Sequence, residues 1–116
     1  MIKTEKLYIK TACSQEDLMY GLKNIKQMDY NKGMLFVFNQ EQTLSFWMKD
    51  TYIPLDIAFL NKNLEIVDIK TMNPLDEIIV KSSIPASYAL EVNKGYFDTN
   101  NIKIGDNISL FMKNTN

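Results

Sequence analysis

The residues best suited to chemistry in this sequence lie in one segment, 47–56, and in one later apolar stretch around position 91. The segment combines an indole ring, an ammonium group, a hydroxyl and carboxylates within ten residues. An aromatic surface beside a few convergent polar groups is typical of a small-ligand pocket. The pattern predicts a binding site formed by Trp47, Lys49, Asp50, Thr51, Asp56 and Glu91.

Two of these residues could also act as catalysts. Asp56 and Glu91 could serve as acid and base in glycoside hydrolysis, with a sugar stacked on Trp47. That chemistry requires the two carboxyls to lie about 5 to 9.5 Å apart. Because the chain has no histidine, every proton transfer would fall on a carboxylate, lysine or tyrosine with a strongly shifted pKa. A non-enzymatic site is therefore the favoured hypothesis.

A purely structural role is the alternative for both carboxylates. Asp56 lies in an apolar strand, where an unpaired carboxylate is costly to bury, so it should accept hydrogen bonds. Lys49 or the backbone amides of residues 50–52 are its nearest candidate partners. Glu91 alternates with apolar neighbours in a strand, which is also compatible with a solvated outer face.

Composition narrows the function classes further. The chain has 116 residues, 14 acidic side chains and 13 basic ones, and all the basic ones are lysine. The absence of histidine and arginine, together with a single cysteine, excludes histidine-based triads, arginine clamps, cysteine-rich metal sites and an internal disulfide. We therefore predict no metal and no cofactor. A net charge of −1 does not favour nucleic-acid binding, and the longest apolar run, residues 34–38, is too short to span a membrane.

The elements that must position these residues are mostly strands, in a single domain over residues 1–116. Ser14 begins a capping pattern, and apolar residues at helical spacing predict a helix over 15–26 that packs on the sheet, with Gly21 inside it. Residues 113–116 are expected to form a flexible tail. Strands are predicted near Leu7–Lys10 and at 34–38, 44–49, 55–60, 64–70, 77–81, 87–93 and 108–112.

About seven short strands with frequent turn signals predict a mainly β fold, either a compact β-sandwich or a small barrel. If strands 44–49 and 55–60 form a hairpin across residues 50–54, Trp47 and Asp56 share a face in only one of two possible registers. The sequence leaves that register open.

Several segments together match one known family in order along almost the whole chain. They are Gly21-Leu22, the run Gly33-Met34-Leu35-Phe36-Val37-Phe38, the run Phe46-Trp47-Met48-Lys49-Asp50-Thr51-Tyr52-Ile53-Pro54-Leu55-Asp56-Ile57, the run Tyr88-Ala89-Leu90-Glu91-Val92, Gly95, and Gly105-Asp106. The chain thereby resembles the domain of unknown function 192 (DUF192) family. The resemblance implies a jelly-roll-like β-domain with one helix packed on it, and it implies no established activity.

The chain departs from the family pattern at a few positions. Lys23 and Ile25 stand where the family usually has methionine and arginine, and Lys26 could replace the charge of that arginine but not its fork geometry. Asp50 stands where asparagine is common. Many members of the family carry an export leader, whereas the first residues here lack the apolar segment of a secretory signal, so we expect a cytoplasmic location.

Three functions remain open at this point. The first is a non-enzymatic binding module for a small polar molecule, a glycan or a protein segment. The second is a structural or assembly protein, such as a homo-oligomer or a virion component of a phage. The third is a carboxylate-based hydrolase acting on glycans. The excess of lysine, asparagine and isoleucine indicates an AT-rich genome and does not distinguish among these functions.

Overall fold

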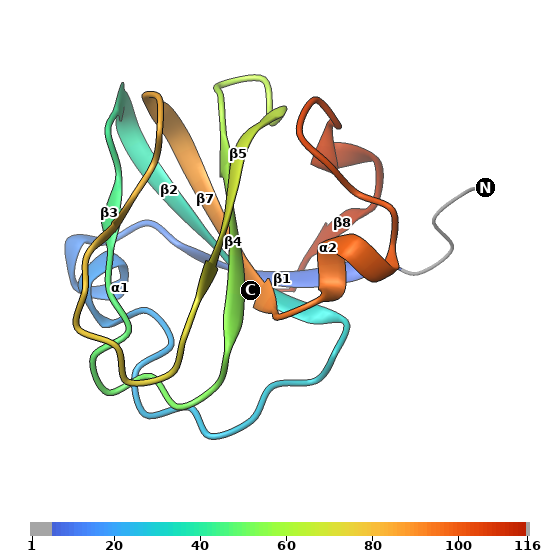
Figure 1. Ribbon diagram of the computed structural model, residues 1–116. Coiled ribbons are helices and arrows are strands. Elements are labelled where there is room, and N and C mark those ends of the chain that lie inside the picture. Colours follow the sequence, from blue (N-terminus) through green and yellow to red (C-terminus); the bar gives the residue numbers. More distant parts are fainter. Residues whose placement is uncertain (1–5, 116) are drawn as a thin grey trace.

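The computed structural model describes residues 6–115, apart from the side chain of Leu110. This part of the chain forms a six-stranded mixed sheet, in the order β5-β4-β7-β2-β1-β8, and a separate two-stranded sheet of β3 and β6 (Figure 1). The strands are β1 (Leu7–Ala12), β2 (Lys32–Gln42), β3 (Ser45–Phe46), β4 (Leu55–Leu60), β5 (Ile66–Met72), β6 (Val80–Lys81), β7 (Ala86–Asn93) and β8 (Met112–Asn114). The helices are α1 (Gln15–Tyr20), α2 (Tyr96–Thr99) and the short 3-10 helix η1 (Ile108–Leu110).

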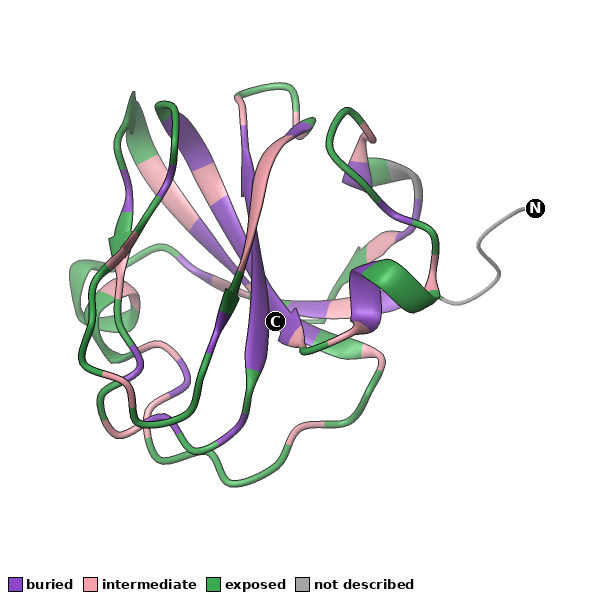
Figure 2. Cartoon of the chain, in the orientation of Figure 1, coloured by how far each residue is buried: buried purple, intermediate pink, exposed green. Residues whose placement is uncertain are grey.

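The centre of the large sheet is β7, which pairs antiparallel with β2 on one side and with β4 on the other. At one edge, β1 is parallel to both of its neighbours, β2 and β8. Every residue of β4 is buried, and β7 is buried along most of its length (Figure 2). A strand buried on both faces requires a covering layer on each side of the sheet.

Those two layers are distinct hydrophobic clusters. One contains Phe36, Ile57 and Phe59 of the sheet together with Leu22 and Met48 from outside it. The other contains a different set, which includes Leu60, Leu90, Val92, Tyr96 and Ile108. In Figure 1, α1, β3 and β6 lie on one side of the large sheet, and α2 lies on the other. Successive residues of β7 therefore point alternately into the two layers.

The prediction of a mainly β fold is confirmed. A closed barrel is wrong, because β5 and β8 are the two edges of the large sheet within residues 6–115 and do not pair with each other. The jelly-roll-like sandwich stays a prediction. Between residues 6 and 115, no helix reaches the length and apolar character that crossing a membrane requires.

The N-terminal helix is shorter than predicted. The Ser14 hydroxyl accepts a hydrogen bond from the Asp17 amide at 3.0 Å, which confirms the predicted cap. Gly21, expected inside the helix, instead ends it with a positive φ of 54°, a conformation that favours glycine. A Cβ atom at Gly21 would lie 3.3 Å from the Phe36 ring, so the chain at this position passes close to a side chain of β2.

Three predicted strands were too long, and the predicted tail is ordered. Segment 44–49 contributes only β3, 77–81 contributes only β6, and 108–112 becomes η1 followed by the start of β8. Lys113 and Asn114 pair with β1, and the Thr115 amide donates to the Ile9 carbonyl at 2.8 Å. Residues 113–115, predicted as part of a flexible tail, therefore have hydrogen-bond partners on the β1 edge. Asn116 lies outside the described residues.

Candidate functional site

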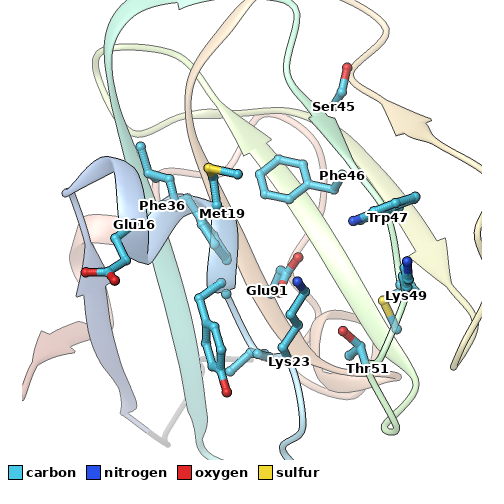
Figure 3. Close-up of a pocket in the computed structure, with 15 residues that line it drawn as sticks. Glu16, Met19, Lys23, Phe36, Ser45, Phe46, Trp47, Lys49, Thr51 and Glu91 are labelled. Atoms are coloured by element: carbon cyan, nitrogen blue, oxygen red, sulfur yellow. The ribbon is translucent and has the colours of Figure 1, made fainter.

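A cleft of about 500 Å³ opens between the α1 segment and the chain that follows β3, with the large sheet as its floor (Figure 3). Its volume is within the range of small-molecule sites. The lining residues come from three parts of the chain: Glu16, Leu18, Met19, Tyr20, Gly21, Leu22 and Lys23 from the helix and its end; Ser45, Phe46, Trp47, Met48, Lys49 and Thr51 from the opposite wall; and Phe36 and Glu91 from the sheet.

Backbone hydrogen bonds hold the wall that contains Trp47 and Lys49. The Met48 amide donates to the Asp76 carbonyl at 3.0 Å, and the Leu75 amide donates to the Thr51 carbonyl at 2.9 Å. Met48 is buried in the apolar layer beneath the wall. These contacts fix the wall against a loop that is distant in sequence.

The two walls are also joined to each other. The Asn24 amide, just beyond the end of α1, donates to the Asp50 carbonyl at 2.8 Å. Asp50 has a positive φ of 60°, which turns the chain at this point. Leu18 and Leu22 pack against the same hydrophobic cluster as Met48. The two walls of the cleft are therefore held in place by a main-chain hydrogen bond between them and by a shared core.

Glu91 lies on the floor of the cleft. It pairs with Met34 of β2 and Ile57 of β4, so its side chain projects into the apolar layer below α1 and β3. Glu91 is only 5% exposed, and within residues 6–115 no hydrogen bond or ion pair involves its carboxyl. Burial raises the pKa of this carboxyl to about 8. At pH 7 the group is mostly a neutral acid, which can donate as well as accept a hydrogen bond.

The mouth of the cleft carries aromatic and cationic groups. Trp47 is 43% exposed, and the ammonium of Lys49 lies 5.5 Å from the centroid of its ring, in cation–π contact. Lys23 enters from the opposite wall, and its side chain extends toward Glu91 in Figure 3. Across the described residues, neither lysine forms an ion pair with a carboxylate.

The structure brings together four of the six predicted site residues. Trp47, Lys49, Thr51 and Glu91 all line the cleft, whereas Asp50 contributes a backbone turn beside it. The alternative that Glu91 lies on a solvated outer face is wrong, because α1 and the chain after β3 cover that face. Asp56 is not in the cleft.

Asp56 lies on the other face of the sheet. It pairs with Val92, whereas the next residue, Ile57, pairs with Glu91. One oxygen of Asp56 accepts from the Thr71 hydroxyl at 2.8 Å, and the other accepts from the Gly95 amide at 2.9 Å. Asp56 is 8% exposed, so both bonds are shielded from water. These contacts give Asp56 the structural role that the sequence allowed, by joining β4 to β5 and to the turn before α2.

The predicted partners of Asp56 were wrong for a physical reason. Segment 44–49 does not form a hairpin with 55–60, because β3 pairs with β6 and β4 pairs with β5 and β7. The amides of residues 50–52 and Lys49 therefore lie in a different part of the fold from the Asp56 carboxyl. With Asp56 and Glu91 on opposite faces, the two carboxyls cannot flank one glycosidic bond, which removes the hydrolase that would use them as a pair.

Sequence reasoning missed the helix side of the cleft. This side is lined by Glu16, Met19, Tyr20 and Lys23. Of these four residues only Lys23 stands out in the sequence, as a departure from the family pattern. The available signal was the Gly21-Leu22 pair, which marks where the chain leaves the helix next to the sheet. In the part of the chain that the structure describes, no cluster of three acidic or cysteine side chains could hold a metal ion.

A family comparison matches this arrangement of segments. The DUF192 family, described as "Uncharacterized ACR", matches residues 2–110. The chain belongs to the DUF192 family. The resemblance predicted from the sequence is thus confirmed. Part of the cleft lining of this DUF192 chain comes from the segments that carry the resemblance: Gly21-Leu22, the strand around Phe36, the run from Phe46 to Thr51, and Glu91.

Two solved structures are similar to this DUF192 chain. A protein from Sinorhizobium meliloti 1021, titled a "putative transcription regulator", has a TM-score of 0.83 and 33% sequence identity, over 85% of this chain and 78% of that chain. A protein of unknown function from Novosphingobium aromaticivorans DSM 12444 has a TM-score of 0.81 and 30% identity, over 85% of this chain and 71% of that chain. No match is found among the curated proteins.

Proposed function

We propose that this DUF192 protein is a non-enzymatic binding module that takes a small molecule in the cleft between α1 and Trp47–Thr51. The observation that carries the proposal is Glu91, a residue only 5% exposed, whose carboxyl has no protein partner within residues 6–115 and lines a cleft of ligand size. A carboxyl that no protein group pairs with can hydrogen-bond to a molecule bound in the cleft, and in this partly dry position the bond is stronger than it would be in water.

The walls of the cleft support the same proposal. Phe46 and Trp47 give the cleft aromatic surface, and the buried Phe36 ring packs edge to face against Phe46 with centroids 5.1 Å apart. Aromatic rings provide large apolar contact area with few rotatable bonds, so little entropy is lost when they contact a ligand. A ligand with an apolar body and one polar end would match this distribution of groups.

Regulation by direct DNA contact is less well supported. One relative is titled a "putative transcription regulator", but this chain has a net charge of −1 and no arginine. Surfaces that bind DNA neutralise phosphates with clustered lysine and arginine. The small-molecule proposal therefore does not depend on that title.

The test is a screen of small fragments, with binding followed by thermal unfolding and by the indole N–H resonance of Trp47, the one tryptophan in the sequence. We expect Trp47→Ala to abolish the fragment-dependent rise in melting temperature while the protein stays folded, because Trp47 is 43% exposed. Tyr52→Ala is the matched control, since Tyr52 is 40% exposed and does not line the cleft. Fragments that bind the two variants equally well would contradict the proposal.

A further inference from the structure

The cleft contains more positive than negative charge when Glu91 is neutral. Two ammonium groups, of Lys23 and Lys49, line it, and the one other carboxyl in its lining belongs to Glu16, which is exposed. The protein as a whole carries a net charge of −1, so this positive balance is local to the cleft. Charge complementarity favours a negatively charged ligand here.

Both lysines are available to a ligand. The ion pairs within residues 6–115 are Lys32 with Asp29 and Lys70 with Asp68, and both lie outside the cleft lining. The ammonium group of Lys49 lies over the Trp47 ring, at the mouth of the cleft. An anion between Lys23 and Lys49 would therefore not have to displace a carboxylate of the protein.

Glu91 completes such a site as a donor. A neutral carboxyl donates an O–H hydrogen bond, and a bond of this kind to an anionic oxygen is short and strong. Asp56 cannot compete for that proton, because it lies on the other face of the sheet. The apolar residues beside Glu91, Met34 and Ile57, favour its uncharged form.

Resting on the small-molecule function proposed above, we infer that the ligand is a small organic carboxylate. Its head group pairs with Lys23 and Lys49 and accepts a hydrogen bond from Glu91, while its apolar body contacts Phe46 and Trp47. A cationic ligand is the opposite case, because it would require Glu91 to be ionised and would be repelled by both lysines.

The experiment compares three probes that share a phenyl group and a one-carbon spacer but differ in charge: phenylacetate, benzyl alcohol and benzyltrimethylammonium. Binding to the wild-type protein is measured from the Trp47 indole resonance and the backbone amides that line the cleft. We expect phenylacetate to bind about tenfold more tightly than the other two at neutral pH. A single charge-assisted hydrogen bond is enough to produce a difference of this size.

Single-lysine variants test the head-group contacts. Lys23→Gln and Lys49→Gln should each weaken phenylacetate binding about five- to tenfold and leave benzyl alcohol binding unchanged. Lys26→Gln is the matched control, because it removes the same charge nearby from a lysine that contacts Tyr52 and does not line the cleft. An equal loss in all three variants would show a general charge effect and overturn the assignment of the anion to Lys23 and Lys49.

The pH profile gives an independent test of Glu91. Phenylacetate remains ionised throughout the range, so wild-type affinity should fall about tenfold per pH unit above the pKa of Glu91, since the ionised carboxyl repels the ligand. Glu91→Gln keeps a donor and removes the titration, so its affinity should be independent of pH. If that variant does not fold, the wild-type profile and the lysine variants still decide the question.

Two outcomes overturn the inference in different ways. Tighter binding of benzyltrimethylammonium, with affinity rising as pH rises, would show that the cleft takes small cations, and the proposed small-molecule function would stand. If none of the three probes shifts the Trp47 indole or the lining amides, both the carboxylate inference and the small-molecule function are wrong.

Discussion

Replacing Glu91 by glutamine should change how the stability of the fold depends on pH. The pKa of Glu91 is raised by burial from 4.5 to about 8, so between these values the folded chain holds one proton more than the unfolded chain. The free energy of unfolding therefore falls as pH rises through this interval, and the contribution of neutral Glu91 is fully lost above about pH 8. One pH unit corresponds to about 1.4 kcal/mol, which gives a loss of about 5 kcal/mol across the interval.

Glutamine does not titrate, so the Glu91→Gln variant lacks this loss. We expect the difference in unfolding free energy, variant minus wild type, to grow by about 5 kcal/mol as pH rises through the interval and then to level off. Urea unfolding followed by circular dichroism at unit steps of pH measures it. Glu16→Gln is the control, because it removes a carboxyl from the lining of the same cleft at an exposed position.

A Glu91→Gln difference that stays constant across this pH interval would refute the argument. It would mean that Glu91 ionises in the folded protein at its ordinary pKa, and hence that water or a cation reaches the carboxyl. The carboxyl carbon resonance of Glu91, followed by NMR through the same titration, reports its protonation directly and separates that outcome from a compensating change elsewhere.

Three further substitutions test the scaffold. Asp56→Asn should cost about 1 to 3 kcal/mol of unfolding free energy in urea, through loss of one of its two hydrogen bonds, and should leave probe binding in the cleft unchanged. Gly33→Ala should cost about 1 to 3 kcal/mol by the same assay, because the added Cβ would lie 2.7 Å from the Glu91 carbonyl oxygen. Stability equal to wild type would show that β2 and β7 separate easily. Ser14→Ala should cost about 1 kcal/mol by removing the cap on the Asp17 amide, and Ser14→Asp should retain most of it; equal melting temperatures for all three proteins would disprove the cap.

Local patterns in the sequence were sufficient for much of the fold. Strand β4 was predicted with the bounds observed. Its six residues are all apolar except Asp56, and they are bounded by Pro54 and Asn61, which are both typical of turns. The Ser14 cap and the mainly β architecture were also predictable, since each depends on neighbours in sequence. Segment 47–56 was predicted as the candidate site because its residue types are unusual for a strand, and of its predicted residues Trp47, Lys49 and Thr51 line the cleft.

The remainder depends on contacts between distant segments, which one sequence does not determine. The partner of β3 is β6, and the chain between these two strands contains all of β4 and β5. A hairpin with β4, the next strand in the sequence, was the prediction that local pattern favoured. Alternation in β7 placed Glu91 and Ala89 on one face. It could not show that α1 and the chain after β3 cover that face, and this covering is what shifts the pKa of Glu91.

The position of β1 has a consequence for how the protein folds. This strand lies between β2 and β8, and it is parallel to both, so no tight turn can form either pairing. Its partner β8 lies at the opposite end of the described chain. Pairing the two strands closes a loop of nearly the whole chain, and the entropy lost in closing it opposes the stabilisation that the pairing provides. We expect β8, whose pairing with β1 closes the longest loop in the large sheet, to dock after the rate-limiting step. Substitutions at Met112 of β8 should then accelerate unfolding far more than they slow refolding.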